Sequence, residues 1–268
     1  MSDPRAALLV IGHGTRDEVG QHEFRAAVAL VAERLPAMIV EHAFLEFCAP
    51  TIAEGLARCA ARGAERVTAL PLLLFSAGHA KHDIPAALAS AAAGHAGLKV
   101  RQTPTLDHHP AIIDLSVRRF REALAVGAAL LPVNDTLLVL VGRGSHDAEA
   151  NAEFARYADT LARRIGVGRL ETCYLAMAEP SLADGLAAAR RLPFRQVVVQ
   201  PHLLFRGRLL DRLREAVCDC RTSDDRRRWI VAEPLGPASL LADAIVDLAT
   251  VAWATAERAI ADDLATNA

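Results

Sequence analysis

The sequence lacks the features that mark several common classes of protein. Its 268 residues include 30 basic and 32 acidic side chains, so no large net charge favours binding to nucleic acid or to an anionic membrane. The apolar run from Ala6 to Ile11 is too short for a membrane span or for the core of a signal peptide. Elsewhere in the sequence, none of the stretches without a charged residue reaches the length that a membrane span requires. We therefore expect a cytoplasmic protein with no nucleic-acid partner and no membrane association.

Paired cysteines and nucleotide-binding motifs are missing as well. The five cysteines form no C-x-x-C pair, and Cys218 and Cys220 are the only two that lie close in sequence. Ordinary structural thiols are therefore expected, rather than disulfides or ligands of an iron–sulfur cluster. The chain contains neither G-x-x-x-x-G-K-[ST] nor G-x-G-x-x-G, so we expect no ATP and no other cofactor.

What the chain does contain is a duplication. The segment Ile11-Gly12-His13-Gly14-Thr15-Arg16-Asp17 returns as Val141-Gly142-Arg143-Gly144-Ser145-His146-Asp147, an offset of 130 residues because 143 minus 13 is 130. One register without a gap over a long span indicates two tandem domains, which we place at residues 1–131 and 132–268. The same offset relates Phe24 to Phe154, Leu45 to Leu175, Pro50 to Pro180, Gly55 to Gly185, Pro71 to Pro201, Phe75 to Phe205 and Pro104 to Pro234.

Short runs rich in Val, Leu and Ile alternate with alanine-rich segments of helical period in both copies. This alternation predicts an α/β fold in which each domain has a four-stranded parallel sheet flanked by helices. Asp17, Thr51, Asp147 and Ser181 are expected to cap helices. The predicted strands are 6–12, 37–44, 66–75, 97–103, 136–142, 170–176, 196–204 and 229–233, and the predicted helices are 17–35, 50–62, 81–94, 110–129, 147–165, 180–191, 208–218 and 238–262.

Three polar side chains follow three successive strands of the first copy. His13 comes after the first predicted strand, Glu46 after the second, and His79 after the third. Loops at the carboxyl edge of a parallel sheet form the ligand sites of such folds. Taken singly, a histidine between two glycines is more often a turn residue than a ligand, but three donors at one edge favour a site. Two imidazoles and a carboxylate suit a borderline divalent ion such as Co²⁺, Fe²⁺, Ni²⁺ or Zn²⁺.

These motifs resemble one known family. Gly12-His13-Gly14-Thr15-Arg16, Phe44-Leu45-Glu46 before Pro50, and the segment from Pro71 to His79 followed by Asp83-Ile84-Pro85 are similar to those of the sirohydrochlorin chelatases, the class II (CbiX-type) chelatases of cobalamin and siroheme synthesis. The resemblance covers both copies and matches the long, fused form, in which the active site is expected in the cleft between the two domains. It implies that His13 and His79 bind the incoming metal and that Glu46 assists as ligand or base.

The chain departs from some long members of that family. They carry a histidine-rich tail and a cysteine motif for an iron–sulfur centre, whereas this sequence ends in Ala265-Thr266-Asn267-Ala268. We therefore predict no cluster. In the second copy His13, Glu46 and His79 are replaced by Arg143, Ala176 and Leu209, which predicts a single metal site in the first copy.

The second copy is expected to hold the carboxylates of the substrate. Sirohydrochlorin is a polycarboxylate, and guanidinium groups are suited to binding such groups, although surface arginines are usually only solvated. For His82, three residues after His79, the alternative to substrate contact is a supporting or metal-delivery role. The candidate substrate-binding residues are Arg143, Arg206, Arg208, His202 and His82.

The predicted activity is insertion of Co²⁺ into sirohydrochlorin without ATP, with Fe²⁺ or Ni²⁺ as possible alternative ions. Insertion of Fe²⁺ in siroheme synthesis is the nearest rival, and the residues do not separate the two because one imidazole–carboxylate set serves both ions. A carrier that binds the metal or the tetrapyrrole without turnover is an alternative of another class, and a hydrolase with a metal-activated water is a third. Fusion of the two domains makes a monomer sufficient, and a homo-oligomer is not excluded.

Overall fold

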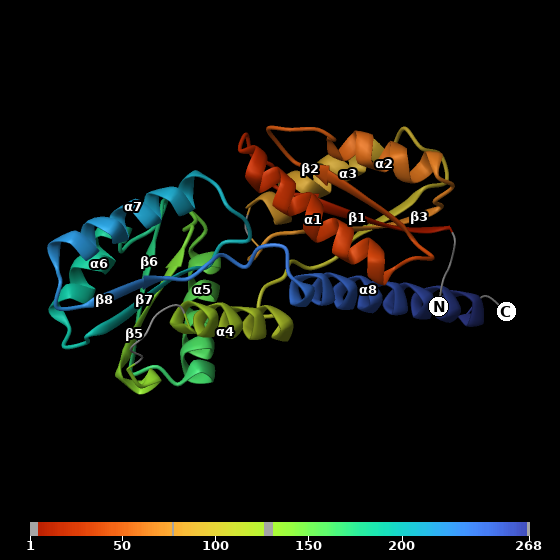
Figure 1. Ribbon diagram of the computed structural model, residues 1–268. Coiled ribbons are helices and arrows are strands. Elements are labelled where there is room, and N and C mark those ends of the chain that lie inside the picture. The colour runs from red at the N-terminus through yellow and green to blue at the C-terminus, as the bar shows by residue number, and fades with distance from the viewer. Residues whose placement is uncertain (1–4, 77, 126–130, 267–268) are drawn as a thin grey trace. The chain divides into compact units, whose positions relative to one another are not determined.

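The computed structural model describes residues 5–76, 78–125 and 131–266, and from residue 256 onward it describes only the backbone of the last helix. The chain divides into two compact units, Met1–Asp107 with Ala238–Ala268, and His108–Pro237. Each unit contains a four-stranded parallel sheet with helices on both faces, so the predicted α/β class with two such sheets is confirmed (Figure 1).

The sheet of the first unit has the strand order β2-β1-β3-β4. Helices α2 and α3 cover one face, and α1 and α8 cover the other (Figure 1). Its elements are β1 (Ala6–Gly12), α1 (Glu18–Arg34), β2 (Ile39–Phe44), α2 (Ile52–Ala61), β3 (Arg66–Pro71), the π-helix η1 (His79–Asp83), α3 (Ile84–Ala92), β4 (Lys99–Gln102) and α8 (Ser239–Thr266).

The second unit repeats this plan with the order β6-β5-β7-β8. Helices α6 and α7 lie on one face of its sheet and α4 and α5 on the other. Its elements are α4 (Pro110–Ala125), the short 3₁₀ helix η2 (Val133–Asp135), β5 (Thr136–Gly142), α5 (Ala148–Ile165), β6 (Arg169–Tyr174), α6 (Leu182–Arg191), β7 (Gln196–Pro201), α7 (Arg208–Ser223) and β8 (Arg228–Val231).

The central strands are buried on both faces. Every residue of β1 and of β5 is buried, as expected for a parallel strand between two helical layers. The four predicted caps are all confirmed. Asp17 accepts hydrogen bonds from the backbone N–H groups of Val19 and Gly20, and Thr51 forms a capping box with Glu54. The Asp147 side chain accepts from the backbone N–H of Glu149 at the start of α5, and the Ser181 side chain accepts from that of Asp184 at the start of α6.

Several boundaries differ from those predicted. Strands β3 and β7 end at Pro71 and Pro201, earlier than the apolar pattern suggested, because the chain leaves the sheet there to form the loops at its carboxyl edge. Helix α7 continues past residue 218 to Ser223. Residues 126–129 of the helix predicted at 110–129 lie outside the described residues.

The compact units do not follow the predicted boundary between residues 131 and 132. The last helix of each copy packs in the other unit, because α8 lies against α1 and β3, whereas α4 lies against α5 and β7. Polar contacts fix both helices. Arg34 Nε donates to Oδ1 of Asp243, a residue of α8, at 2.7 Å. Gln200 Nε2 donates to the backbone oxygen of Ser116, a residue of α4, at 2.9 Å.

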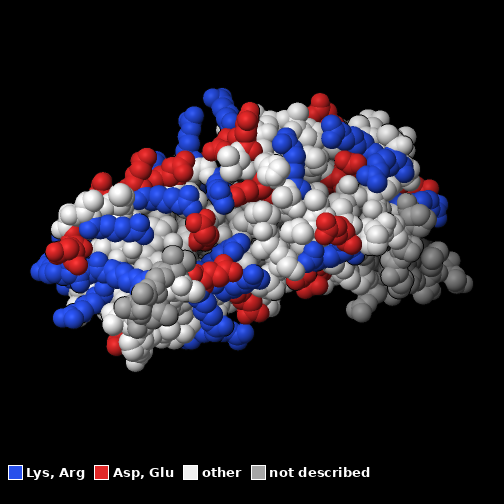
Figure 2. All heavy atoms as spheres, in the orientation of Figure 1, with Lys and Arg blue, Asp and Glu red and all other residues white. Residues whose placement is uncertain are grey.

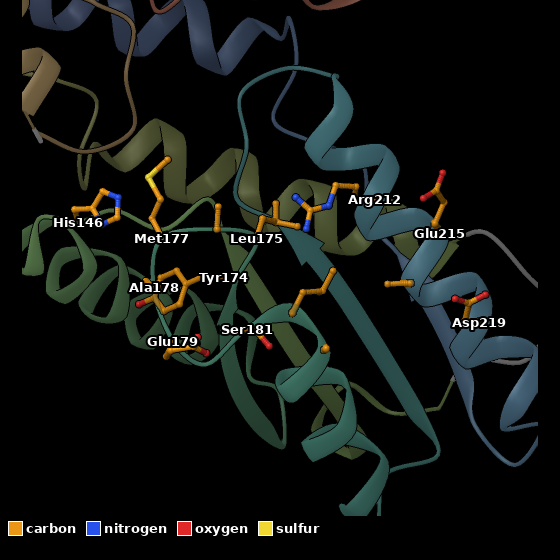
Figure 3. Close-up of a pocket in the computed structure, with 14 residues that line it drawn as sticks. His146, Tyr174, Leu175, Met177, Ala178, Glu179, Ser181, Arg212, Glu215 and Asp219 are labelled. Carbon is orange, nitrogen blue, oxygen red and sulfur yellow. The ribbon is translucent and has the colours of Figure 1, made fainter.

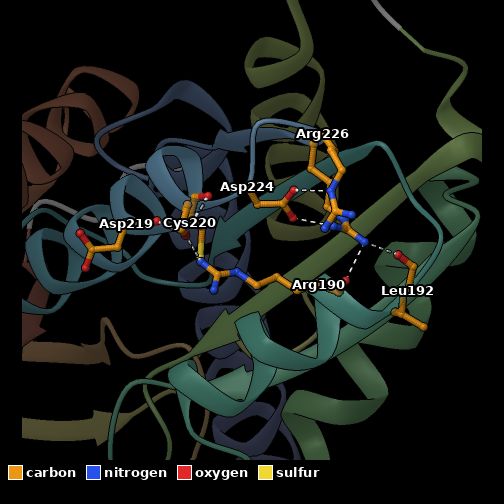
Figure 4. A network of polar contacts seen from close by, with 8 residues as sticks. Arg190, Leu192, Asp219, Cys220, Asp224 and Arg226 are labelled. Atoms are coloured by element: carbon orange, nitrogen blue, oxygen red, sulfur yellow. Dashed lines mark hydrogen bonds and ion pairs between the residues drawn. The ribbon is translucent and has the colours of Figure 1, made fainter.

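The run Arg226-Arg227-Arg228 has the composition of a solvated stretch, but Arg227 is not solvated. Its side chain is nearly buried and pairs with Asp224, which has only 6% of its side chain exposed. Arg227 Nη2 also donates to the backbone oxygens of Arg190 and Leu192 at 2.6 and 2.9 Å (Figure 4). The guanidinium therefore satisfies carbonyls at the end of α6, a structural role.

The surface carries mixed charge. On the face shown in Figure 2, basic and acidic side chains are interspersed rather than gathered by sign. None of the helices within the described residues combines the length and the apolar character that crossing a membrane requires.

Candidate metal centre

The carboxyl edge of the first sheet holds two imidazoles in contact. His13 follows β1 and His79 begins η1, and their ring centroids lie 4.8 Å apart with the planes at 82°. Both side chains are partly exposed. Two histidines from separate segments thus meet at the edge where ligands bind in parallel α/β sheets.

The backbone around His13 is fixed by its neighbours. The backbone N–H of Leu45 donates to the Gly12 oxygen, and that of Glu46 donates to the His13 oxygen, both at 2.9 Å. Gly14 has a φ of +95°, and a Cβ there would lie 1.9 Å from the backbone oxygen of Glu46. Only glycine fits at this position, so His13 is presented by a rigid turn.

Hydrogen bonds define the tautomer of each imidazole. Nδ1 of His13 lies 3.2 Å from the backbone oxygen of Gly14, and Nδ1 of His79 lies 2.7 Å from Oδ2 of Asp83. A carbonyl oxygen and a carboxylate only accept, so Nδ1 must carry the proton in both rings. The lone pair of each ring is then on Nε2, the arrangement in which histidine binds a metal.

Asp83 contacts His79, although it was not predicted as a site residue. It lies four residues after His79 at the end of η1, where the backbone N–H of Ile84 bonds to the His79 oxygen in the i→i+5 pattern. Single π-helical turns often occur at functional sites. The i,i+4 spacing of a histidine and an aspartate was the available indication that the two side chains interact.

Glu46 is not grouped with the imidazoles. Its backbone pairs with His13, but its side chain is exposed. Among the residues that the structure describes, no three His, Cys, Asp or Glu side chains lie close enough together to hold one ion. The expected role of Glu46 as third ligand or base therefore stays a prediction.

Phe47 and Arg16 also lie beside His13. The Phe47 ring stacks on the His13 ring with 5.8 Å between centroids and 26° between planes. The Arg16 guanidinium carbon lies 5.6 Å from the centroid of the Phe47 ring. Neither residue was predicted as part of a site, although Arg16 belongs to the repeated motif.

The second unit keeps this backbone frame and changes its side chains. Gly144 has a φ of +87°, and a Cβ there would lie 1.8 Å from the Ala176 oxygen, as Gly14 does with Glu46. Arg143 stands where the first unit has His13, and it is exposed. The frame is thus a property of the duplicated fold, whereas the imidazole pair belongs to the first unit.

His202 was predicted to contact substrate, and its placement is at odds with that role. The residue is 3% exposed, and the centroid of its ring lies 4.2 Å from the centroid of the Tyr157 ring. Burial, with a smaller contribution from His108, lowers the pKa of His202 to about 3. Its counterpart in the first copy is the buried Leu72, so the repeat itself indicated an internal position.

The other predicted substrate residues are at the surface. His82 is exposed on η1, and Arg143, Arg206 and Arg208 are exposed in the second unit. None of these three arginines lines the cavity of about 740 Å³ that the second unit forms beside α7. That cavity instead has Arg212 reaching toward Leu175, with Met177 and His146 on the opposite side (Figure 3).

The sequence and the fold are similar to those of known proteins. The family model CbiX matches residues 7–123 and 137–252, which together make up most of the chain. The sirohydrochlorin ferrochelatase of Priestia megaterium is 34% identical over 230 residues, covering 86% of this chain and 84% of that protein. The sirohydrochlorin cobaltochelatase of the same organism is 30% identical over 213 residues, covering 79% of this chain and 68% of that protein.

A solved structure has the same fold. SirB from Bacillus subtilis with Fe³⁺ superposes with a TM-score of 0.81 and 24% identity, covering 92% of this chain and 94% of that one. The match of the family model to both copies, together with the sequence identity to these relatives, shows that the chain belongs to the CbiX family of sirohydrochlorin chelatases.

Proposed function

We propose that this protein inserts a divalent metal ion, Co²⁺ by preference, into sirohydrochlorin without ATP. The observation that carries the proposal is the contact between His13 and His79, whose ring centroids lie 4.8 Å apart at the carboxyl edge of the first sheet. The names of the relatives from Priestia megaterium, a sirohydrochlorin ferrochelatase and a cobaltochelatase, support the substrate.

The imidazole pair is suited to hold an ion that must later leave. Each ring directs its lone pair through Nε2, because Nδ1 donates to Gly14 in one case and to Asp83 in the other. Two neutral nitrogen ligands suit Co²⁺ or Fe²⁺ and leave coordination positions for the ring nitrogens of the substrate. A site with two protein ligands favours transfer over permanent retention.

The reaction exchanges two protons for the metal. Two pyrrole N–H bonds of the macrocycle break, two protons leave, and the two nitrogen lone pairs bind the ion. Imidazole is mostly neutral at physiological pH and accepts protons, and we propose that Glu46 assists at the rim as ligand or base. No covalent intermediate and no nucleotide are required.

The metal that the protein inserts is proposed to be Co²⁺ rather than Fe²⁺. Imidazole nitrogens bind both ions, with Co²⁺ the tighter of the two in the usual order of affinities. The rival, insertion of Fe²⁺, is favoured by the 34% identity to a ferrochelatase. Parallel measurements of kcat/KM for the two ions decide between them, and a higher value for Fe²⁺ would replace the cobalt assignment.

The exposed arginines of the second unit are proposed to contact substrate carboxylates. Arg143 takes the place of His13 in the repeat, and Arg206 and Arg208 follow β7. Replacing Arg143 and Arg206 with Gln should raise the KM for sirohydrochlorin while leaving Co²⁺ affinity unchanged. Unchanged kinetics would reject this assignment without affecting the metal site.

The test of the activity mixes protein with excess sirohydrochlorin and Co²⁺ or Fe²⁺ and follows the absorbance of the macrocycle. We expect many turnovers for the natural protein, loss of turnover in His13→Ala and in His79→Ala, and full activity in the matched control His22→Ala, whose exposed histidine lies on α1. Conversion of a single equivalent would replace the enzyme with a carrier. Full activity in both site variants would reject the imidazole pair.

A further inference from the structure

Phe47 is a large aromatic residue that is exposed beside His13. It lies between β2 and α2 with 55% of its surface exposed, and its backbone has a φ of 67°, in the left-handed region that non-glycine residues rarely adopt. Such strain persists where the surrounding structure enforces it, and it is concentrated at functional sites. The loop therefore holds a large apolar ring outward against its own backbone preference.

The duplicated loop shows that the outward position is built into the frame. Met177, the residue 130 positions later, has a φ of 59° and is 46% exposed. Its side chain lines the cavity of the second unit (Figure 3). Both copies thus present an apolar side chain at the same point of the loop, but only the copy with the two imidazoles has an aromatic ring there.

The orientation of the ring follows from its contact with His13. The two ring planes differ by 26°, with 5.8 Å between centroids. A metal bound to Nε2 lies in the plane of the imidazole, and a macrocycle that receives the ion lies across the metal–nitrogen bond. Phe47 therefore meets the face of such a macrocycle with its edge, the T-shaped arrangement that aromatic pairs prefer.

Arg16 supplies a cation at the same place. Its guanidinium carbon lies 5.6 Å from the centroid of the Phe47 ring, and the side chain is exposed. Stacking against an aromatic ring restricts a guanidinium while leaving its N–H groups available for a carboxylate. A flat ring with carboxylates at its periphery matches an aromatic edge beside a guanidinium.

We propose that Phe47 and Arg16 form the macrocycle-binding wall of the metal site, with Phe47 in contact with the tetrapyrrole face and Arg16 paired with one peripheral carboxylate. This inference rests on the proposed function. It adds a substrate subsite within the first unit, next to the ion, and it makes Phe47 a residue that positions the ring rather than the metal.

The test separates binding of the macrocycle from binding of the metal. Phe47→Gly removes the ring and suits the left-handed backbone, so the variant is expected to fold. We expect its Kd for sirohydrochlorin, measured without metal, to rise about 3- to 10-fold, and its affinity for Co²⁺ alone to stay within about twofold. Phe47→Trp should restore sirohydrochlorin binding, and Val19→Ala, which removes an exposed apolar side chain on α1, should change neither constant.

Arg16 is tested by the dependence on salt. Arg16→Gln should raise the KM for sirohydrochlorin and weaken its dependence on ionic strength, whereas Phe47→Gly should leave that dependence intact. Unchanged sirohydrochlorin affinity in Phe47→Gly, in a preparation that still turns over, would reject the proposed macrocycle-binding wall. It would not affect the assignment as a chelatase. An equal loss of Co²⁺ affinity would show that Phe47 only orients His13, and it would also overturn the inference. If the natural protein neither binds nor metallates sirohydrochlorin, the proposed function itself fails.

Discussion

Replacing Asp83 with Asn should weaken metal binding through His79 without touching the metal. Asp83 Oδ2 accepts the Nδ1 proton of His79 at 2.7 Å, which fixes the tautomer with the lone pair on Nε2 and holds the ring in position to bind a metal. Asparagine keeps the shape but loses the charge, and its amide can also offer an N–H that favours the other tautomer. The variant should therefore bind Co²⁺ less tightly.

The size of the effect follows from the exposure of the pair. Loss of such a partner typically costs 10- to 100-fold in metal affinity. Here the side chains of His79 and Asp83 are 35% and 56% exposed, so solvent screens the interaction and the lower end applies. We expect Co²⁺ affinity to fall about tenfold, equivalent to about 1.4 kcal/mol.

The assay is a calorimetric titration with Co²⁺ alone, accompanied by turnover at subsaturating metal. The KM for Co²⁺ should rise by the same factor while the KM for sirohydrochlorin stays unchanged. Glu65→Gln is the matched control. It removes a surface carboxylate that pairs with Arg5 just before the start of β3, whereas His79 follows the end of that strand. In a His79→Ala background Asp83→Asn should have no further effect. A full tenfold loss in that background would refute the assigned role.

Two further predictions concern the frame and the buried histidine. Gly14→Ala should lower the free energy of unfolding by about 2 kcal/mol or more and abolish Co²⁺ binding, because its Cβ would lie 1.9 Å from the Glu46 oxygen. Gly144→Ala, its counterpart in the second unit, should lower stability similarly but leave Co²⁺ affinity intact, and equal loss of Co²⁺ binding in both variants would contradict the single metal site. For His202, burial holds the pKa at about 3 in the folded state against about 6.5 in the unfolded state, so its contribution to stability is complete above pH 6.5 and is lost as the pH falls toward 3. His202→Leu should therefore reduce the loss of stability between pH 7.5 and pH 5, measured by urea unfolding, by about 2 kcal/mol, and an unchanged loss would show that His202 is not held neutral.

The sequence predicted the two sheets and the helix starts because their causes are local. Continuous apolar runs such as Ala6–Gly12 suit a strand buried on both faces, and Asp17 and Thr51 bond to the backbone of the helices that they precede. The duplication supplied a second, independent instance of each element. It also placed the histidines correctly at the end of β1 and after β3.

The exchange of the last helices could not be predicted. Both α4 and α8 follow the fourth strand of their copy with an apolar face, and either sheet offers a similar surface to such a face. The choice depends on specific contacts such as Arg34 with Asp243, which join residues more than 200 positions apart. No periodic pattern in the sequence contains that information.

The candidate site was predicted in part. Strand ends brought His13 and His79 together, but the orientation of the Glu46 side chain depends on a loop whose backbone includes the left-handed Phe47. The π-helical turn η1, which joins Asp83 to His79, was not expected, because the helical pattern predicted a helix only from residue 81 onward. The internal position of His202 was indicated by its counterpart Leu72, a buried residue, and not by the exposed arginines with which it was grouped.

Whether His13 and His79 share one ion is measured by X-ray absorption spectroscopy of the protein loaded with one equivalent of Co²⁺ in the absence of substrate. Binding by His13 and His79 would place two imidazole nitrogens in the coordination shell of the natural protein, and one in each of His79→Ala and His13→Ala. A shell that contains no imidazole, or one that is unchanged in both variants, would contradict it.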